Sequence, residues 1–173
     1  MQRIAIIGCS GGGKSTLARA LGERLGLPVI DLDTLFWKPG WTESATEPFR
    51  QAVEAAAEGE AWVIDGNFIS ASTAHLARAD TVIWLDQPRV LCLWRAFRRA
   101  ITSFGRARAD LAPGCPERVD PTFYRYIWNW DRLTRPRMES ALATYAPCAG
   151  LVMLGSDQDV ARFLAGLRAK SLF

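Results

Sequence analysis

Gly8-Cys9-Ser10-Gly11-Gly12-Gly13-Lys14-Ser15-Thr16, near the start of this 173-residue chain, is a complete phosphate-binding loop of the pattern G-x-x-x-x-G-K-[ST]. The apolar run Ile4–Ile7 precedes it and is typical of a buried strand. Leu17, Leu21 and Leu25 follow at helical spacing. Strand, glycine-rich loop and helix, in this order, are the context that the motif requires. The sequence therefore predicts a site that binds a polyphosphate.

The residues of this loop have separate expected roles in that site. Glycines let backbone N–H groups turn inward around phosphate, and the following helix directs its positive end at the same place. Lys14 is expected to reach the β- and γ-phosphates, and the Ser15 hydroxyl is expected to ligate Mg²⁺. The predicted cofactor-binding residues of the loop are Gly8, Ser10, Gly11, Gly12, Gly13, Lys14, Ser15 and Thr16.

Composition narrows the class of protein. Hydrophobic residues make up 49% and charged residues 23%, which suits one globular domain over residues 1–173. We expect no membrane association, because no apolar run approaches the roughly 20 residues that span a bilayer. The four cysteines form no C-x-x-C pair, and strand residues follow Met1 closely, so we expect reduced thiols, no signal peptide and a cytoplasmic protein. A net charge of +3 is too small for a dedicated nucleic-acid binder.

Five short, continuously apolar runs predict the fold class. Such runs are typical of parallel strands covered on both faces, and helical segments separate them. The sequence therefore predicts an α/β protein with three α/β/α layers and a five-stranded parallel sheet. The predicted strands are Arg3–Ile7, Pro28–Ile30, Ala61–Ile64, Thr81–Leu85 and Leu151–Leu154.

Two segments depart from plain alternation of strands and helices. Residues 34–59, with the aromatic stretch Leu35–Trp41, are the predicted acceptor-binding segment. Residues 100–122 contain a loop rich in glycine, proline and charge, and they form the predicted helical lid insertion. Asp120-Pro121 predicts the start of a helix, and Pro136 predicts a break in it.

Arginines are unusually concentrated before, within and after the predicted lid. Six arginines lie between Arg89 and Arg108 with no acid among them, and a second group lies between Arg125 and Arg137. Arginine suits bidentate binding of phosphate, although solvated helix faces also collect it. We favour phosphate binding and expect the lid to close around it. The assigned side chains are Arg95 for the cofactor and Arg99 and Arg135 for catalysis.

Acidic residues follow three of the predicted strands, where ligands bind in parallel α/β sheets. They are Asp31, Asp33, Asp65 and Asp86. Asp65 is predicted to hold a metal-bound water, and Asp33 is predicted to accept a proton from the acceptor or to position it. Aspartate is also common in turns and helix caps at strand ends, which is the alternative for each.

Three further residues are candidate contacts to the acceptor. Trp37 can stack on a base or sugar face and Lys38 can meet an anion, with packing beneath a loop as the equal alternative. Asn67 can hydrogen-bond the acceptor, or it can serve as a turn residue. His75 has no readable partner and is expected on the solvated surface.

Several stretches resemble known families. The phosphate loop and Asp65-Gly66 are similar to those of adenylate kinases, and Asp31-x-Asp33 resembles shikimate kinases. Nearly the whole chain resembles an adenylate-kinase-related bacterial family that carries the name "DNA topology modulation protein". The stretches that carry this likeness are Leu32–Trp41, Ile64–Phe68, Leu91–Arg95, Gly114–Glu117 and Arg135-Pro136.

The resemblance implies a strand order of 2-3-1-4-5, a mobile lid after the fourth strand, and ATP or a related nucleotide at the phosphate loop. In relatives the loop like Gly155-Ser156 frames adenine, so Ser156 is a candidate cofactor contact, with a helix cap as the alternative. The expected function is a Mg²⁺-dependent phosphotransferase acting on a small-molecule acceptor, in a monomer or homodimer. The alternative is a slow ATPase or regulatory nucleotide-binding protein that influences DNA topology or another partner. We do not expect direct DNA binding.

Overall fold

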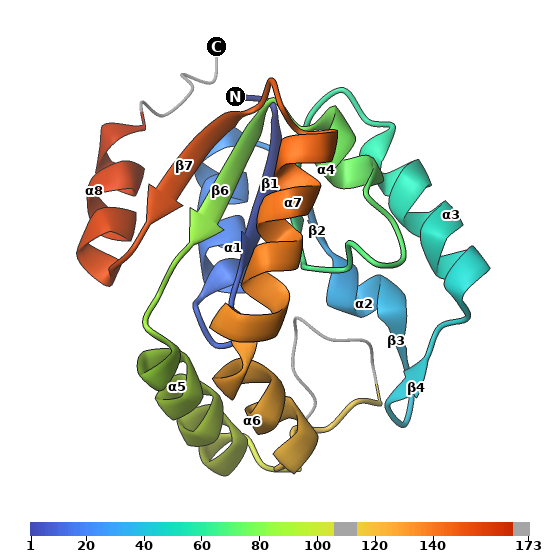
Figure 1. The fold of residues 1–173 in the computed structure, drawn as a ribbon, viewed down its shortest axis with the longest axis vertical. Coiled ribbons are helices and arrows are strands. Elements are labelled where there is room, and N and C mark those ends of the chain that lie inside the picture. The colour runs from blue at the N-terminus through green and yellow to red at the C-terminus, as the bar shows by residue number, and fades with distance from the viewer. Residues whose placement is uncertain (106–113, 168–173) are drawn as a thin grey trace.

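A five-stranded parallel sheet lies at the centre of the protein, for which we describe residues 1–105 and 114–167 of a computed structural model (Figure 1). The order of its strands is β2-β5-β1-β6-β7. This is the predicted order 2-3-1-4-5, counted over the five strands of this sheet, so the predicted fold class is confirmed. The strands are β1 (Arg3–Gly8), β2 (Val29–Asp31), β5 (Trp62–Asp65), β6 (Thr81–Leu85) and β7 (Gly150–Leu154).

The three central strands, β5, β1 and β6, are buried on both faces, which explains why they are apolar without alternation. The edge strands β2 and β7 are partly exposed. Ile4 and Ile6 of β1 pack with α1 (Lys14–Leu25) and α8 (Asp157–Gly166) on one face. Ala5 and Ile7 pack in a second cluster on the opposite face. The helices that contribute to this second cluster are α3 (Thr46–Ala57), α4 (Ala74–Arg78), α5 (Arg89–Thr102), α6 (Pro121–Trp128) and α7 (Arg135–Tyr145).

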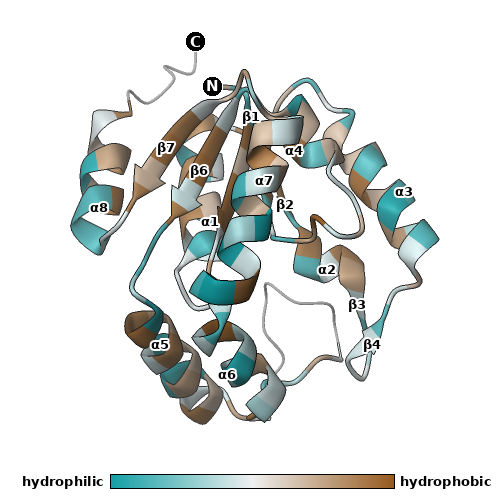
Figure 2. Ribbon diagram, viewed as in Figure 1, coloured by the Kyte–Doolittle hydropathy of each residue, from teal (hydrophilic) through white to brown (hydrophobic). Residues whose placement is uncertain are grey.

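The ribbon coloured by hydropathy follows these layers (Figure 2). The central strands are hydrophobic along their length, whereas most helices alternate between hydrophobic and hydrophilic bands. No helix within the two described ranges is both long and apolar enough to cross a membrane.

The predicted helix after Asp120 is divided into α6 and α7. Asp120 caps α6 as predicted, since its Oδ1 accepts the Thr122 N–H at 2.8 Å. The helix ends at Trp128, and a π-helical turn η1 (Trp130–Thr134) leads into α7. Pro136 therefore lies in the first turn of α7, directly after the π-helical turn, so the predicted break or kink in the helix is found at this proline.

The predicted acceptor segment folds into α2 (Leu32–Phe36), a small hairpin of β3 (Trp37–Lys38) and β4 (Thr42–Glu43), and α3. The hairpin is tied to the C-terminal part of the predicted lid. Gly40 N donates to Gly114 O at 2.8 Å, and Trp41 Nε1 donates to Pro116 O at 2.9 Å. Residues 106–113, including Arg106 and Arg108, lie outside the described residues.

His75 is fully buried in α4, which corrects the expectation of a solvated side chain. Neither ring nitrogen has a hydrogen-bond partner in the described part of the chain. Burial lowers the pKa of His75 to about 4, because the charged imidazolium would lose its hydration. The ring is therefore neutral in the folded protein at pH 7.

We predict that His75 makes the fold sensitive to mild acid. The unfolded chain binds more protons than the folded chain between pH 6.5 and the folded pKa of about 4, so stability falls as pH falls through this range. Between pH 7 and pH 5 this group should lower the free energy of unfolding by about 2 kcal/mol. Urea unfolding at both pH values should show that, from pH 7 to pH 5, the free energy of unfolding changes less favourably by about this amount in the wild type than in His75→Leu, because the other titrating groups, Asp31 included, are common to both proteins. Equal changes in both proteins would contradict the prediction.

Candidate functional site

The phosphate loop has backbone conformations that favour glycine. Gly8, Gly11 and Gly13 have φ values of 143°, 84° and 97°, in the region that side chains rarely adopt. A Cβ at Gly8 would lie 2.4 Å from the Leu85 carbonyl oxygen, and one at Gly11 would lie 2.3 Å from that of Cys92. The loop is thus packed tightly against β6 and α5.

The loop leads directly into the N-terminus of α1. Gly13 is the N-cap residue, and no side chain caps this end of the helix. The N-terminus of a helix favours an anion through its N–H groups and its dipole. Lys14 folds back over the loop, and its Nζ donates to the Cys9 carbonyl at 3.4 Å. Ser10 is partly buried in the loop, and Thr16 is exposed in the first turn of the helix.

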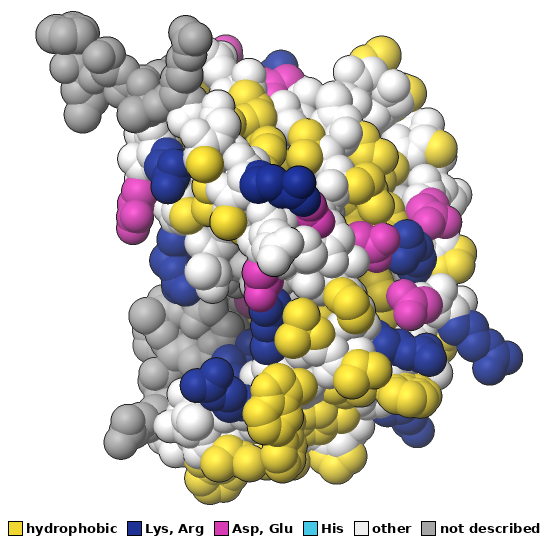
Figure 3. Space-filling view, turned by 90° about the vertical axis from the view of Figure 1, so that its left-hand side faces the viewer, with side chains coloured by type: hydrophobic (Ala, Val, Ile, Leu, Met, Phe, Trp, Pro, Cys, Tyr) yellow, Lys and Arg dark blue, Asp and Glu magenta, His cyan; other side chains and the backbone are white. Residues whose placement is uncertain are grey.

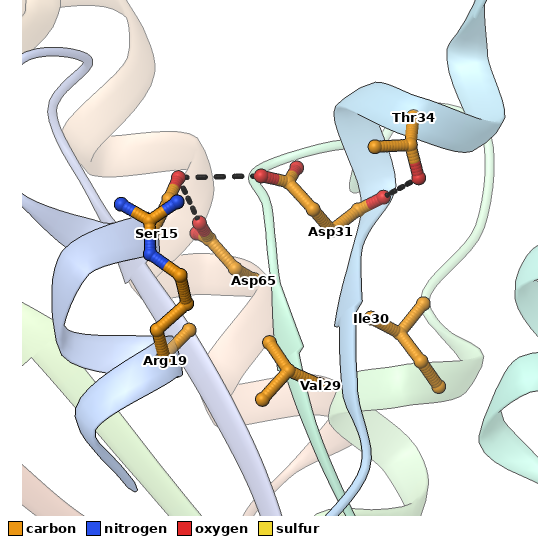
Figure 4. A pocket seen from close by; sticks show the side chains of 8 residues that line it. Ser15, Arg19, Val29, Ile30, Asp31, Thr34 and Asp65 are labelled. Carbon is orange, nitrogen blue, oxygen red and sulfur yellow. Dashed lines mark hydrogen bonds between the residues drawn. The ribbon is translucent and has the colours of Figure 1, made fainter. Parts of the chain in front are cut away.

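Ser15 lies beside two carboxylates (Figure 4). Its Oγ is 2.7 Å from Asp65 Oδ2 and 3.2 Å from Asp31 Oδ2. Asp31 and Asp65 are register partners at the ends of the adjacent strands β2 and β5. The parallel sheet therefore brings one hydroxyl and two carboxylates, far apart in the sequence, to the same point.

The electrostatics of this cluster favour a cation. Burial raises the pKa of Asp31 to about 7, with further contributions from the nearby charges of Asp65 and Asp33. A divalent cation would relieve this repulsion, and hard oxygen donors suit Mg²⁺. The described residues contain no group of three or more His, Cys, Asp or Glu side chains placed to hold a metal. An Mg²⁺ ion here would therefore keep waters or bind phosphate oxygens, as it commonly does.

Asp33 has a different position from Asp31, which contacts Ser15. Asp33 is in the first turn of α2, and its backbone N–H is capped by Asp31 Oδ1 at 2.9 Å. Sequence reasoning favoured Asp33 over Asp31, and Asp31 is the one that contacts Ser15. The signal that identifies Asp31 is its position as the last residue of a strand, which it shares with Asp65.

A pocket of about 340 Å³ opens beside this cluster. Figure 4 shows Arg19, from α1, extending toward Ser15 within it. Arg19 lies one turn after Ser15 on the same helix face, a spacing that could have marked it in the sequence. The pocket is lined by Ser15, Ala18, Arg19, Val29, Ile30, Asp31, Thr34 and Asp65.

Asn67 holds the phosphate loop. Its Oδ1 accepts the Gly8 N–H at 3.2 Å, and its Nδ2 donates to the Gly8 carbonyl at 2.7 Å. Both ends of the amide are thus engaged by the backbone of the loop. This position differs from the acceptor contact expected from the sequence.

Trp37 packs rather than facing an open site. Its ring meets Phe36 and Trp41 edge-on, with centroids 4.9 Å and 5.4 Å away, and Cys115 is buried against it. Lys38 is exposed, and its carbonyl accepts the Cys115 thiol at 3.2 Å. The contacts of Trp37 are therefore those of packing beneath a loop, the alternative to stacking on an acceptor.

The three assigned arginines each pair with a carboxylate of the same chain. These ion pairs compensate the positive charge of the three side chains, so these arginines do not simply repel one another. Arg135 binds Asp86 through both ends of its guanidinium, at 2.6 and 2.9 Å. The other two pairs are Arg99 with Glu117, at 3.1 Å, and Arg95 with Asp157.

Ser156 is the N-cap of α8. Its Oγ accepts the Asp159 N–H at 3.1 Å and donates to Asp159 Oδ2 at 2.7 Å. These bonds are those of a helix cap, the alternative that the sequence left open. A contact of Ser156 with adenine stays a prediction.

Comparisons with known proteins bear on the fold. No protein-family model matches the chain. The uncharacterized protein YqaC of Bacillus subtilis (strain 168) is 27% identical over 132 residues, which cover 75% of this chain and 73% of that protein. Threonine synthase-like 1 of Mus musculus is 29% identical over 102 residues, covering 50% of this chain, which spans only 14% of the length of the mouse protein.

Among solved structures, the chain is similar to a shikimate kinase from Acinetobacter baumannii in complex with shikimate. The TM-score is 0.51 and the identity 22%, with 95% of this chain and 89% of that chain covered. This likeness concerns the fold. The chain has the P-loop fold of shikimate kinase.

Proposed function

We propose that this protein is a Mg²⁺-dependent phosphotransferase that moves the γ-phosphoryl group of ATP to a small acceptor. The observation that carries the proposal is the position of Ser15. Its hydroxyl lies at the mouth of a glycine loop with positive φ values and within 3.2 Å of two strand-end carboxylates. Few chemistries other than phosphate-bound Mg²⁺ call for this combination.

In this proposal, different residues bind the phosphates and the Mg²⁺ of Mg·ATP. The backbone of residues 8–15 and the N-terminus of α1 bind the phosphates, and Lys14 neutralises their charge. Ser15 would be the direct ligand for Mg²⁺, and Asp65 and Asp31 would hold the ion through water. When bound, Mg²⁺ supplies charge neutralisation at the β- and γ-phosphates. No covalent intermediate is needed, because positioning and electrostatics can supply most of the rate.

We assign the acceptor to the side of the site formed by α2 and the hairpin of β3 and β4. Asp33 accepts the proton of the attacking hydroxyl or positions that hydroxyl. Lys38 is exposed on the hairpin and is suited to an anionic group of the acceptor. The complex of the similar kinase with shikimate makes hydroxy acids the first acceptors to test, beside nucleosides and nucleotides.

Arg95, Arg99 and Arg135 act when phosphate displaces their carboxylate partners. Arginine forms bidentate bonds with phosphate as well as with carboxylate. Each exchange moves a guanidinium from Asp157, Glu117 or Asp86 to a phosphate oxygen. These arginines would thus join the site on binding of Mg·ATP, and until then the ion pairs with carboxylates compensate their charge.

A screen with γ-labelled ATP tests the proposal. Transfer of label to one acceptor among nucleosides, nucleotides and small hydroxy acids supports it. Slow release of labelled phosphate without any acceptor, altered by added DNA, supports instead a regulatory ATPase of the kind that the name "DNA topology modulation protein" suggests. Absence of both would contradict both readings.

We predict that Lys14→Ala weakens binding of ATP by about 10- to 100-fold. A charge-assisted hydrogen bond contributes about 1.5–3 kcal/mol, which corresponds to that range. Competition against a fluorescent ATP analogue measures the change. Arg162→Ala, which removes a cation from the exposed side of α8, serves as the control and should bind ATP as the wild type does. Wild-type affinity in Lys14→Ala would contradict the assigned role.

We predict that Asp65→Asn lowers turnover by about 100-fold, because it removes charge from the Mg²⁺ cluster while keeping the size of the side chain.

We predict that Asp31→Asn lowers turnover and raises the midpoint of thermal unfolding measured without Mg²⁺, because it relieves repulsion between buried carboxylates. The control for both variants is Glu60→Gln, which removes one negative charge from an exposed position outside the cluster and should leave turnover unchanged. Unchanged turnover in both variants would remove the cluster from the mechanism.

A further inference from the structure

The outward face of α5 carries a stripe of large apolar side chains. Its members recur at spacings of four, three and four residues, so they share one helix face. The stripe consists of Val90, Trp94, Phe97 and Ile101, each between 46% and 66% exposed. Figure 3 shows hydrophobic side chains gathered on the lower part of this side of the molecule, where α5 lies. A contiguous exposed apolar patch often marks a surface that binds another protein, a membrane or a ligand.

The opposite face of α5 is apolar as well. Cys92, Ala96 and Ala100 are buried against the rest of the protein. A helix that is apolar on both faces is normally buried on both. The outward stripe therefore lacks a covering element within the described residues.

The charges beside the stripe limit what can cover it. Three of the four arginines of α5 have carboxylate partners in the same chain: Arg89 with Asp131 at 4.0 Å, Arg95 with Asp157, and Arg99 with Glu117 at 3.1 Å. The fourth, Arg98, is exposed, and it belongs to none of the ion pairs found among the described residues. An anionic membrane or a nucleic acid is bound mainly by several cations that are not already paired. With one such cation on α5, the apolar stripe is better suited to another face of the same kind.

The size of the stripe agrees with a dimer contact. Large aromatic side chains such as Trp94 and Phe97 offer about 150–250 Å² each, so the half-exposed stripe, with the smaller Val90 and Ile101, presents on the order of 500 Å² of surface. A standard interface buries about 800 Å² on each partner, of which more than half is apolar. The stripe can therefore supply the apolar part of such an interface, and the neighbouring Trp128 of α6, which is also exposed, adds to it.

We propose that the protein forms a two-fold symmetric dimer in which α5 of one copy packs antiparallel against α5 of the second. The axis passes midway along the stripe, so that Trp94 of each copy meets Phe97 of the other. An isologous contact of this type is closed and stops at two subunits. The inference is independent of the proposed function.

The dimer would also stabilise the position of the phosphate loop, through α5. The backbone of Cys92 on α5 lies against Gly11, where a Cβ would come within 2.3 Å of the Cys92 carbonyl oxygen. A second copy on the outward face of α5 would hold this helix in place behind the loop.

Sedimentation equilibrium over about 1 to 100 μM protein tests the proposal, since a dimer responds to concentration by mass action. We expect a dimer for the wild type and a monomer for Phe97→Glu, with the dissociation constant raised at least about 100-fold by burial of an unpaired charge. Tyr145→Glu is the matched control, because Tyr145 is an aromatic residue with the same exposed fraction of 46% on α7. It should remain dimeric. Circular dichroism confirms that each variant is folded.

A mixture of two variants tests the antiparallel arrangement. Trp94→Lys and Phe97→Glu should each be monomeric alone. Mixed together, they place opposite charges across one of the two equivalent contacts and should form a heterodimer. A mixture that stays monomeric would contradict the arrangement.

Three further outcomes would overturn the dimer itself. The first is a wild type that stays monomeric at the highest concentration, and the second is a Phe97→Glu variant that dimerises as the wild type does. The third is a monomeric wild type that floats with phosphatidylglycerol vesicles while Phe97→Glu does not, which would assign the stripe to a membrane surface instead.

Discussion

The fixation of Gly8 at the end of β1 is the constraint on which the site depends. Its backbone N–H and carbonyl are both hydrogen-bonded by Asn67, which follows the neighbouring strand β5. On its other side, the Leu85 carbonyl of β6 leaves no room for a side chain. These contacts set the direction in which the chain leaves the sheet, and thereby the position of the loop and of α1. Ser15 consequently arrives beside Asp31 and Asp65.

The carboxylates around Ser15 destabilise the protein without a ligand, and a bound cation can offset that loss of stability. Two carboxylates at adjacent strand ends repel each other, and their partial burial adds to the cost, as the raised pKa of Asp31 indicates. A cation would remove both penalties. Such local conflict within an otherwise consistent fold is expected at functional sites, where stability is exchanged for binding.

Much of the fold could be predicted from the sequence, because local pattern determines it. The apolar runs and the glycine loop indicate the strands, the helix α1 and the predicted phosphate site directly. The choice of Asp31 over Asp33 depends on which residue ends β2, and boundaries of this kind shift by a residue or two. The burial of His75 and the ion pair of Arg135 with Asp86 depend on contacts between distant segments. No local pattern encodes those contacts.

The central claim is that the glycine loop and the Ser15 cluster form one site for Mg²⁺ and a nucleoside triphosphate. Titration calorimetry of the wild type with ATP, with and without Mg²⁺, tests it most directly. The account predicts saturable binding of one ATP per chain that is tighter with Mg²⁺, because the cation relieves the repulsion between Asp31 and Asp65. Absence of ATP binding, or an affinity that Mg²⁺ leaves unchanged, would contradict the account.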